Sequence, residues 1–418
     1  MNAYTLAKER YAALGVDTEA VLETLKNVTV SVHCWQGDDV VGFDAKEALS
    51  GGIQTTGNYP GKATTPEQLM ADFDEVLRLT PGKKKLNLHA SYAIFEAGEF
   101  ADRDAIQPKH FSRWVAYAKE RGLGIDFNPT FFSHSMVKDG LTLSSPDETV
   151  RHFWVEHGKR CMAIAEYFAE ETGKPCVINF WIPDGYKDYP ADRLSPRRRY
   201  AQSMDEILSV PYDKTKVFPC IESKVFGIGL ESYTVGSHEF CMGYVMSKKS
   251  DHIILTLDTG HYHPTEVVSA KLGAAYAFSD HVLLHVSRPI RWDSDHVVAF
   301  DDETKAIMEE LVRLGKLDAT YIATDFFDAS INRVVAWVTG LRNTRKAILA
   351  ALLQPVEAMK KAEREGDVSA RIAMVQEFKA GGMLNPVWDY YCAQKNAGVG
   401  LTWLADVKKY EADVLSKR

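Results

Sequence analysis

Short apolar runs recur along the chain, and each becomes polar or aromatic at its end. Runs rich in β-branched and aromatic residues are typical of strands. The segments between them repeat apolar residues at helical spacing, most clearly at 110–122, 149–173 and 303–317. The eight runs are 28–35, 85–92, 124–130, 176–182, 217–224, 253–260, 282–289 and 320–326. Strands that alternate with helices predict a parallel sheet, and eight such units predict an α/β fold of the (β/α)₈ TIM barrel type.

The placement of the polar residues favours a closed barrel over an open sheet. Side chains such as His89 and Asn128 come late in their runs, where a barrel carries its chemistry. An open doubly wound sheet usually has a glycine-rich phosphate turn after its first strand, whereas this chain has QGDDVVGFD there. The glycine-rich stretch 51–61 lacks a G-K-[ST] motif. We expect it to form a loop over the barrel mouth.

Both ends of the chain extend beyond the strand pattern. A helix is predicted over 3–26, before the first strand, and the strand pattern ends after about residue 340. We expect a barrel with an N-terminal helix over residues 1–340. A helical C-terminal extension is expected over 341–418, packed on the barrel or on a neighbouring subunit.

Composition narrows the class of protein. The 418 residues carry a formal net charge of -8, which argues against nucleic acid as a partner. The basic runs 83–85 and 197–199 have no aromatic residues among them and are expected to be solvated. The six cysteines form no C-x-x-C pair and are expected to be reduced, buried thiols. The chain shows no secretory signal and no apolar run of the roughly 20 residues that a membrane span needs. We therefore expect a cytoplasmic protein without a membrane partner.

Carboxylates and imidazoles gather at the ends of the last four predicted strands, which are neighbours on one rim of a barrel. Two like charges about 4 Å apart cost about 4 kcal/mol at an effective dielectric constant of about 20. A bound divalent metal would relieve this repulsion. The predicted ligands are Glu222, Asp258, His261, His285, Asp293, Asp295 and Asp325.

The ligand types indicate which metals would bind, and how many ions. Oxygen ligands with some imidazole and no thiolate favour Mn²⁺, Mg²⁺ or Co²⁺ over a structural zinc. Seven ligands are too many for one small ion but suit two. The expected sets are Glu222, Asp258, His285 and Asp325 for the first ion, and His261, Asp293 and Asp295 for the second. Each residue alone could be a helix N-cap, a turn or a core histidine, but four successive strand ends together favour the metal site.

Other residues at this rim are candidates for work on a substrate. Lys224 shares a strand face with Glu222, so its ammonium would either pair with the carboxylates or stabilise charge on a substrate oxygen. A Schiff-base role is less favoured beside so many anions. His89 is a candidate for a ring-oxygen contact or a general acid, with a structural histidine as the alternative. The candidate apolar walls for a sugar-like ligand, which could instead be core aromatics, are Trp35, Phe131, Trp181 and Phe226.

Several long motifs resemble those of the L-rhamnose isomerase family, the metal-dependent aldose–ketose isomerases of rhamnose catabolism. They are SVHCWQGDDVVGFD, NLHASYA, FWIPDG, ESKVFGIGLESYTVGSHEF, LDTGHYHPTEVV, LLHVSRPIRWDSDHVV and DFFDASINR. The resemblance runs from about residue 3 to past residue 410. It implies a TIM barrel and a cytoplasmic enzyme, usually a homotetramer. It also implies two Mn²⁺ ions per subunit, with Co²⁺, Mg²⁺ or Zn²⁺ as substitutes, on the same two ligand sets.

The resemblance also implies a reaction between L-rhamnose and L-rhamnulose. His89 is the candidate to assist ring opening, and a hydride would then move from C2 to C1 between oxygens stabilised by the metals and Lys224. Asp325 is expected to count among the catalytic residues as well as the metal ligands. An enediol route stays open. An apolar wall around the 6-deoxy methyl group would leave some breadth toward other aldoses.

Three other functions compete with the isomerase. A binuclear metallohydrolase on the same barrel usually places His-x-His at the end of the first strand, where this chain has VHCWQ. A barrel aldolase would use Lys224 as a Schiff base. A sugar-binding protein without activity would not need two metals.

Overall fold

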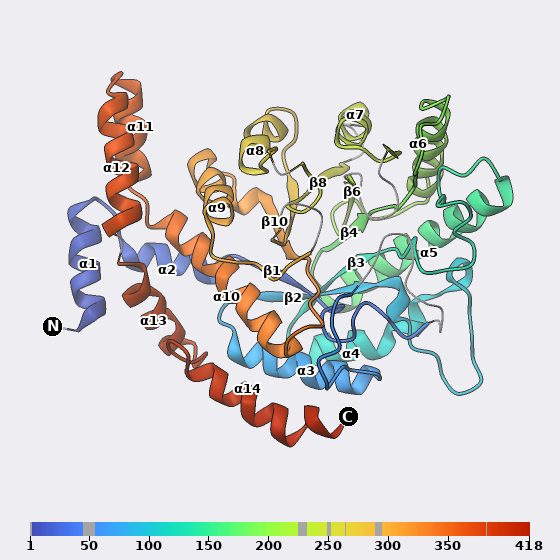
Figure 1. The fold of residues 1–418 in the computed structure, drawn as a ribbon, viewed down its shortest axis with the longest axis horizontal. Coiled ribbons are helices and arrows are strands. Elements are labelled where there is room, and N and C mark those ends of the chain that lie inside the picture. The colour runs from blue at the N-terminus through green and yellow to red at the C-terminus, as the bar shows by residue number, and fades with distance from the viewer. Residues whose placement is uncertain are drawn as a thin grey trace.

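Eight parallel strands form a closed barrel in the order β1-β2-β3-β4-β6-β8-β9-β10, and β10 pairs back with β1 (Figure 1). The computed structural model describes residues 2–44, 55–224, 232–248, 252–263, 265–288, 295–381 and 383–418. The barrel strands are β1 (Val30–His33), β2 (Lys84–His89), β3 (Gly124–Asn128), β4 (Cys176–Phe180), β6 (Val217–Glu222), β8 (Ile254–Asp258), β9 (Val282–Val286) and β10 (Thr320–Thr324). Each predicted run overlaps one of these strands, so the predicted TIM barrel is confirmed.

A helix follows each barrel strand and packs on the outside of the barrel (Figure 1). Local sequence sets where these helices begin and end. In α9, Asp301 accepts a hydrogen bond from the Thr304 amide at the start, and Gly315 adopts a left-handed conformation with φ of 66° at the end. The eight helices are α3 (Pro66–Leu79), α4 (Ser112–Glu120), α5 (Glu148–Thr172), α6 (Ser195–Leu208), α7 (His238–Ser247), α8 (Ser269–Tyr276), α9 (Asp302–Leu314) and α10 (Arg333–Leu352). Two short strands, β5 (Gly185–Tyr186) and β7 (Tyr233–Thr234), pair with each other antiparallel outside the barrel.

The barrel interior is layered. Five strands each contribute one residue to a small buried apolar cluster, which is separate from the large core beneath the helices. Its members are Val177, Cys220, Ile254, Leu283 and Ala323. Because side chains two positions apart share a strand face, the next residues toward the carboxyl ends also face inward. They are Asn179, Glu222, Thr256, His285 and Asp325. The apolar layer therefore forms the floor beneath the polar ends of the strands.

Helices outside the barrel repeat occupy both ends of the chain. The helix predicted over 3–26 is in fact two, α1 (Ala3–Ala13) and α2 (Thr18–Asn27), separated by a turn in which Gly15 has φ of 78°. The predicted C-terminal extension contains α11 (Val356–Arg364), α12 (Val368–Gly381), α13 (Leu384–Gln394) and α14 (Thr402–Asp413). In Figure 1 the α11–α12 pair projects beside α1, and α13 and α14 run past the barrel helices. The boundary expected at residue 340 falls within α10, which continues to Leu352.

The C-terminus is fixed to the barrel through α3. The Arg418 guanidinium lies 2.6 Å from a carboxylate oxygen of buried Asp72, and the Tyr410 hydroxyl donates to the same carboxylate at 2.7 Å. Of the loop predicted over 51–61, residues 51–54 lie outside the described residues. In the described part, the Tyr59 amide donates to the Ala329 carbonyl, beyond β10.

The prediction that both basic runs are solvated holds for Lys83 and Arg198, which are exposed, but is wrong for the other residues of the two runs. The Lys85 ammonium pairs with Asp126 at 2.6 Å, and the Lys84 ammonium donates to two backbone carbonyls. Arg197 and Arg199 likewise donate to backbone carbonyls. The backbone carbonyls that accept from Lys84 belong to Thr80 and Gly82, just after α3. Sequence context did not reveal these partners.

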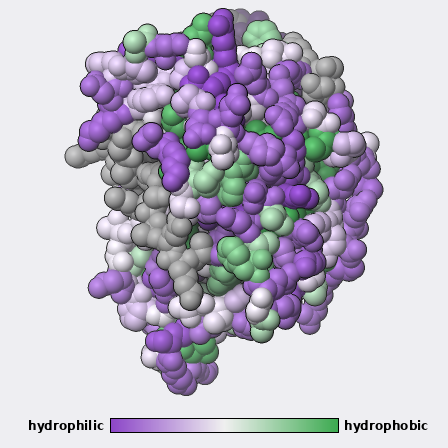
Figure 2. Space-filling view, turned by 90° about the vertical axis from the view of Figure 1, so that its right-hand side faces the viewer, coloured by the Kyte–Doolittle hydropathy of each residue, from purple (hydrophilic) through white to green (hydrophobic). Residues whose placement is uncertain are grey.

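The predicted state of the cysteines is confirmed, since all six are buried and without a disulfide. Within the described part of the chain, no helix has both the length and the apolar character that crossing a membrane requires. The face on the side of α5 and α6 is mostly hydrophilic, with small scattered apolar patches (Figure 2).

Candidate metal centre

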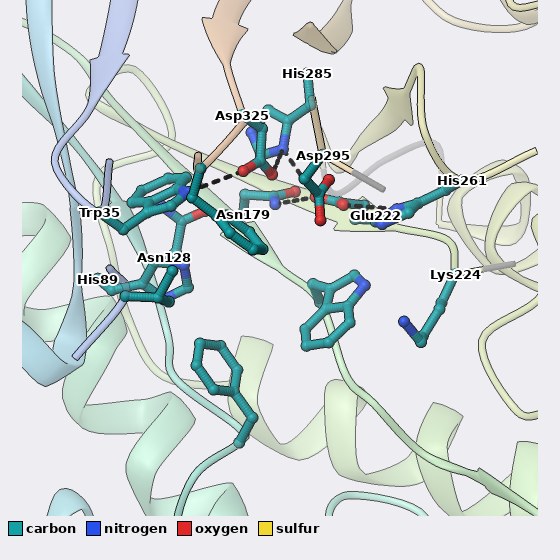
Figure 3. Close-up of a pocket in the computed structure, with 14 residues that line it drawn as sticks. Trp35, His89, Asn128, Asn179, Glu222, Lys224, His261, His285, Asp295 and Asp325 are labelled. Atoms are coloured by element: carbon teal, nitrogen blue, oxygen red, sulfur yellow. Dashed lines mark hydrogen bonds and ion pairs between the residues drawn. The ribbon is translucent and has the colours of Figure 1, made fainter. Parts of the chain in front are cut away.

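Four of the predicted ligands converge at the carboxyl ends of β6, β8, β9 and β10. Glu222, Asp258, His285 and Asp325 each offer a ligand atom, and these atoms lie within 4.8 Å of one another. His285 is central (Figure 3): its Nδ1 lies 3.1 Å from a Glu222 oxygen, 3.2 Å from Asp325 and 3.7 Å from Asp258. Glu222 and Asp258 end their strands, His285 is the penultimate residue of β9, and Asp325 directly follows β10. The barrel thus assembles the first predicted ligand set.

The buried carboxylates of this cluster would be stabilised by a nearby positive charge. Burial opposes a charged imidazole, yet the carboxylates of Glu222 and Asp325 raise the pKa of His285 well above its usual value. Burial, together with the neighbouring carboxylates, raises the pKa of Asp258. Burial works against the charged form of Glu222, but the imidazoles of His285 and His261 hold its pKa well below the usual range. A proton on His285 supplies one positive charge, and a divalent ion would supply two.

The donor atoms fit a metal. Within the part of the chain that is described, Oδ2 of buried Asp258 accepts no hydrogen bond, although its Oδ1 accepts one from the Gly260 amide at 2.6 Å. A buried carboxylate oxygen without a hydrogen-bond donor is costly unless a cation satisfies it. Three carboxylates and one imidazole, without a thiolate, form a donor set that suits Mn²⁺ or Mg²⁺.

The second predicted ligand set lies beside the first. His261 Nδ1 is 2.9 Å from Glu222 Oε1, and Asp295 lines the same pocket (Figure 3). Asp293 lies outside the described residues. Because Oε1 of Glu222 faces His261 and Oε2 faces His285, this one carboxylate stands between the two sets.

Aromatic and aliphatic side chains form the other walls of the pocket. Trp35 and Trp181 line it as predicted, but Phe131 does not: it is fully buried and packs against Trp154. Its neighbour Phe132 lines the pocket instead. Phe131 and Phe132 are consecutive and point to opposite sides, so one side chain lies in the core and the next one lines the pocket. The other apolar lining residues are Val40 and Phe327.

The remaining candidates face the pocket from two sides. Lys224 is nearly fully buried, and its ammonium lies 4.8 Å from the ring centroid of Trp181. His89 lies across the pocket, with Nδ1 3.2 Å from the Thr130 hydroxyl (Figure 3). Burial lowers the pKa of His89 to about 3, so its imidazole is neutral at physiological pH. Phe226 lies outside the described residues.

Sequence reasoning missed contacts around the predicted ligands. The Trp35 indole donates to Asp325 at 2.9 Å, so this residue contacts a predicted ligand as well as forming a wall. Asn128 and Asn179 also line the pocket, and Asn179 donates to Glu222. The only signal for the two asparagines is that each lies at or near a strand end.

A parallel (β/α)₈ barrel with a buried carboxylate–histidine cluster at the carboxyl ends of its strands defines the class: a barrel enzyme with a pocket suited to a divalent metal. A family profile described as L-rhamnose isomerase (RhaA) matches residues 1–418. The chain belongs to the L-rhamnose isomerase family. It is therefore an aldose–ketose isomerase, and the metallohydrolase alternative is not favoured.

Individual relatives agree with the family assignment. The chain is 54% identical over 416 residues to L-rhamnose isomerase of Listeria monocytogenes serotype 4a (strain HCC23), covering 99% of this chain and 98% of that protein. It is 52% identical over 418 residues to L-rhamnose isomerase of Salmonella typhi, covering 100% and 98%. Among solved structures, an L-ribulose 3-epimerase superposes with a TM-score of 0.50 at 13% identity, covering 80% of this chain and 96% of that one. At that identity, the likeness supports the fold alone.

Proposed function

We propose that this protein interconverts L-rhamnose and L-rhamnulose with bound Mn²⁺ as the first step of rhamnose breakdown. The observation that carries the proposal is the convergence of Glu222, Asp258, His285 and Asp325 within 4.8 Å. Glu222, His285 and Asp325 line a pocket with aromatic walls. The names of the relatives supply the sugar.

Two ions per subunit are proposed. The first would be held by Glu222, Asp258, His285 and Asp325, and the second by His261, Asp293 and Asp295, with Co²⁺, Mg²⁺ or Zn²⁺ as substitutes. Glu222 Oε1, which faces His261, would make this carboxylate common to both ions. When bound, such ions polarise sugar oxygens and lower the pKa of water in their coordination shell.

The side chains of the pocket have distinct proposed tasks. His89 is a neutral imidazole whose Nδ1 contacts the Thr130 hydroxyl, so its Nε2 would take the proton of the C1 hydroxyl and return it to the ring oxygen, which opens the pyranose. Lys224 would donate to a substrate oxygen as negative charge develops during the hydride shift from C2 to C1. Asp325, oriented by the Trp35 indole, would fix the end of the substrate that reacts. Phe132, Phe327 and Val40 offer the 6-deoxy methyl group an apolar surface.

The test strips the protein with EDTA and then restores Mn²⁺ against a panel of aldoses, with ketose formation as the readout. L-rhamnose should give the highest kcat/KM, activity should vanish in EDTA, and Mn²⁺ should restore it. L-rhamnose carrying deuterium at C2 separates the two routes, because a hydride shift retains the label at C1 whereas an enediol loses it to solvent. Tight sugar binding without turnover in Mn²⁺ would instead indicate a sugar-binding protein.

A homotetramer in the cytoplasm is the proposed working form. The six buried thiols without a disulfide suit a reducing compartment. Among the α12 side chains that are described, 368–379, none is fully buried, although seven of the twelve are apolar. An apolar helix left uncovered in one protomer suggests burial against another copy.

A further inference from the structure

Three polar side chains form a buried chain of hydrogen bonds just above the apolar floor of the barrel. The Thr256 hydroxyl donates to Asn179 Oδ1 at 2.7 Å, and Asn179 Nδ2 donates to Glu222 Oε2. The residues come from the neighbouring strands β8, β4 and β6, and Thr256 is the direct pairing partner of Glu222. All three are at most 4% exposed.

The chemistry of these groups fixes the donor-to-acceptor direction of the hydrogen bonds. A carboxylate only accepts hydrogen bonds, so the amide must turn its NH₂ group toward Glu222 and its oxygen away. The Thr256 hydroxyl is the donor that satisfies this oxygen. The Thr256 side chain also contacts the Cys220 thiol, a member of the apolar floor. Without that hydroxyl, Asn179 Oδ1 is a buried acceptor left unpaired, and the amide loses the group that fixes its orientation.

Orientation matters because Glu222 faces both histidines. Its Oε1 lies 2.9 Å from His261 and its Oε2 lies 3.1 Å from His285. Rotation about the bond to the carboxylate carbon would turn both oxygens away from these positions together. The donor from Asn179 to Oε2 opposes that rotation.

We propose that Thr256 and Asn179 are positioning residues that hold the Glu222 carboxylate in the plane needed to bind metal. Neither has to touch the ion or the sugar. Thr256 acts through Asn179, and Asn179 acts through Glu222. The inference rests on the proposed metal centre. It adds that Thr256 and Asn179, which are not ligands themselves, help to determine metal affinity.

The test compares Mn²⁺ affinity in three variants of the full-length protein stripped of metal. Thr256→Val keeps the shape and removes the hydroxyl, and Thr256→Ser keeps the hydroxyl. Thr344→Val is the matched control, because Thr344 is also fully buried but donates to the Gly340 carbonyl within α10. Mn²⁺ binding is followed by titration calorimetry and by the electron paramagnetic resonance signal of free Mn²⁺. Thermal unfolding of each stripped protein checks that it is folded.

Loss of an outer partner of a metal ligand typically weakens metal binding about 10- to 100-fold. We expect Thr256→Val to raise the Kd for Mn²⁺ at least about 10-fold. Thr256→Ser and Thr344→Val should stay within about 3-fold of the parent protein. At saturating Mn²⁺, the kcat of Thr256→Val should return to within about 3-fold, because the added metal overcomes the weaker site.

Three outcomes would overturn the inference, and they are distinguishable. If the parent protein binds Mn²⁺ and Thr256→Val binds it equally well, Thr256 has no positioning role, while the proposed function stands. If the parent protein takes up no Mn²⁺, the proposed metal centre and this inference fail together. A low kcat in Thr256→Val at saturating Mn²⁺, with unchanged affinity, would also contradict the inference.

Discussion

Asp38 is a buried carboxylate outside the metal centre, and it links stability to pH. It accepts hydrogen bonds from the Tyr92 hydroxyl at 2.6 Å and the Gly42 amide at 2.7 Å. Burial nevertheless raises its pKa to about 7. An unfolded aspartate has a pKa of about 3.9. Between these values the folded protein binds the extra proton, so this residue makes stability fall as pH rises.

Replacing Asp38 by Asn should remove this pH dependence. The wild type should lose about 2–3 kcal/mol between pH 5 and pH 8 through this one group, and Asp38→Asn should not. Urea unfolding at several pH values, read as the difference between the two proteins, isolates the effect. Asp280→Asn, at an exposed position, should leave the wild-type slope unchanged. Parallel pH profiles for Asp38→Asn and the wild type would contradict the raised pKa.

At the residue scale, the convergence of the first predicted ligand set could be foreseen because strand ends of a parallel barrel share one rim. Glu222, Asp258, His285 and Asp325 needed only their strands to be recognised. The prediction names Phe131, whereas Phe132 lines the pocket, because the direction of a side chain just beyond a strand depends on the loop backbone, which no spacing rule gives. Thr256 looks in sequence like any strand residue. Its proposed role depends on contacts with Asn179 and Glu222, which lie on two other strands.

At the scale of elements, buried arginines of α10 donate hydrogen bonds to backbone carbonyls at the ends of neighbouring helices. Arg342 donates to the Leu79 carbonyl at the end of α3 at 3.2 Å. Arg345 donates to the carbonyls of Val28, which caps α2, and of Lys83. Cations suit helix C-termini, where carbonyls lack partners within the helix. Gly82 has φ of 89°, and a side chain there would collide with the Arg345 guanidinium.

Replacing Arg345 by Met should therefore destabilise the fold. The variant removes the guanidinium donor from the Val28 carbonyl and one of two donors from the Lys83 carbonyl, which also accepts from the Val30 amide. This loss should lower the free energy of unfolding by about 2–4 kcal/mol. The midpoint of urea unfolding measures the change. Arg198→Met, at an exposed arginine of α6, should change stability by no more than about 0.5 kcal/mol. Equal midpoints for the two variants would show that the buried guanidinium contributes nothing.

At this scale, sequence reasoning misplaced element boundaries because the apolar pattern continues across them. The helix expected over 3–26 is two helices, because Gly15 turns the chain while the apolar spacing continues on both sides. The boundary at residue 340 cuts α10 because a long buried helix gives no sign of where the barrel repeat ends. Strand existence was easier to predict, since each buried run is short and distinct.

At the scale of the whole molecule, α12 is the element least explained by one protomer. Val368 is 55% exposed and Ile372 is 58% exposed. These two residues are four positions apart, so they share a helix face. In Figure 1 this helix projects from the barrel next to α11 and α1. An apolar face on a projecting helix is a natural contact for a second copy of the chain.

Replacing Ile372 by Glu should break the proposed assembly and leave the protomer folded. A charge costs little at an exposed position but several kcal/mol in an apolar interface. Light scattering after gel filtration should give the wild type a multiple of the 46.8 kDa chain mass and Ile372→Glu a smaller multiple. Leu194→Glu is the matched control, since Leu194 is 53% exposed and lies just before α6, across the molecule from α12 in Figure 1. It should keep the wild-type mass. A wild-type mass for Ile372→Glu would exclude this face of α12 as the contact, whereas a monomeric wild type would exclude the tetramer itself.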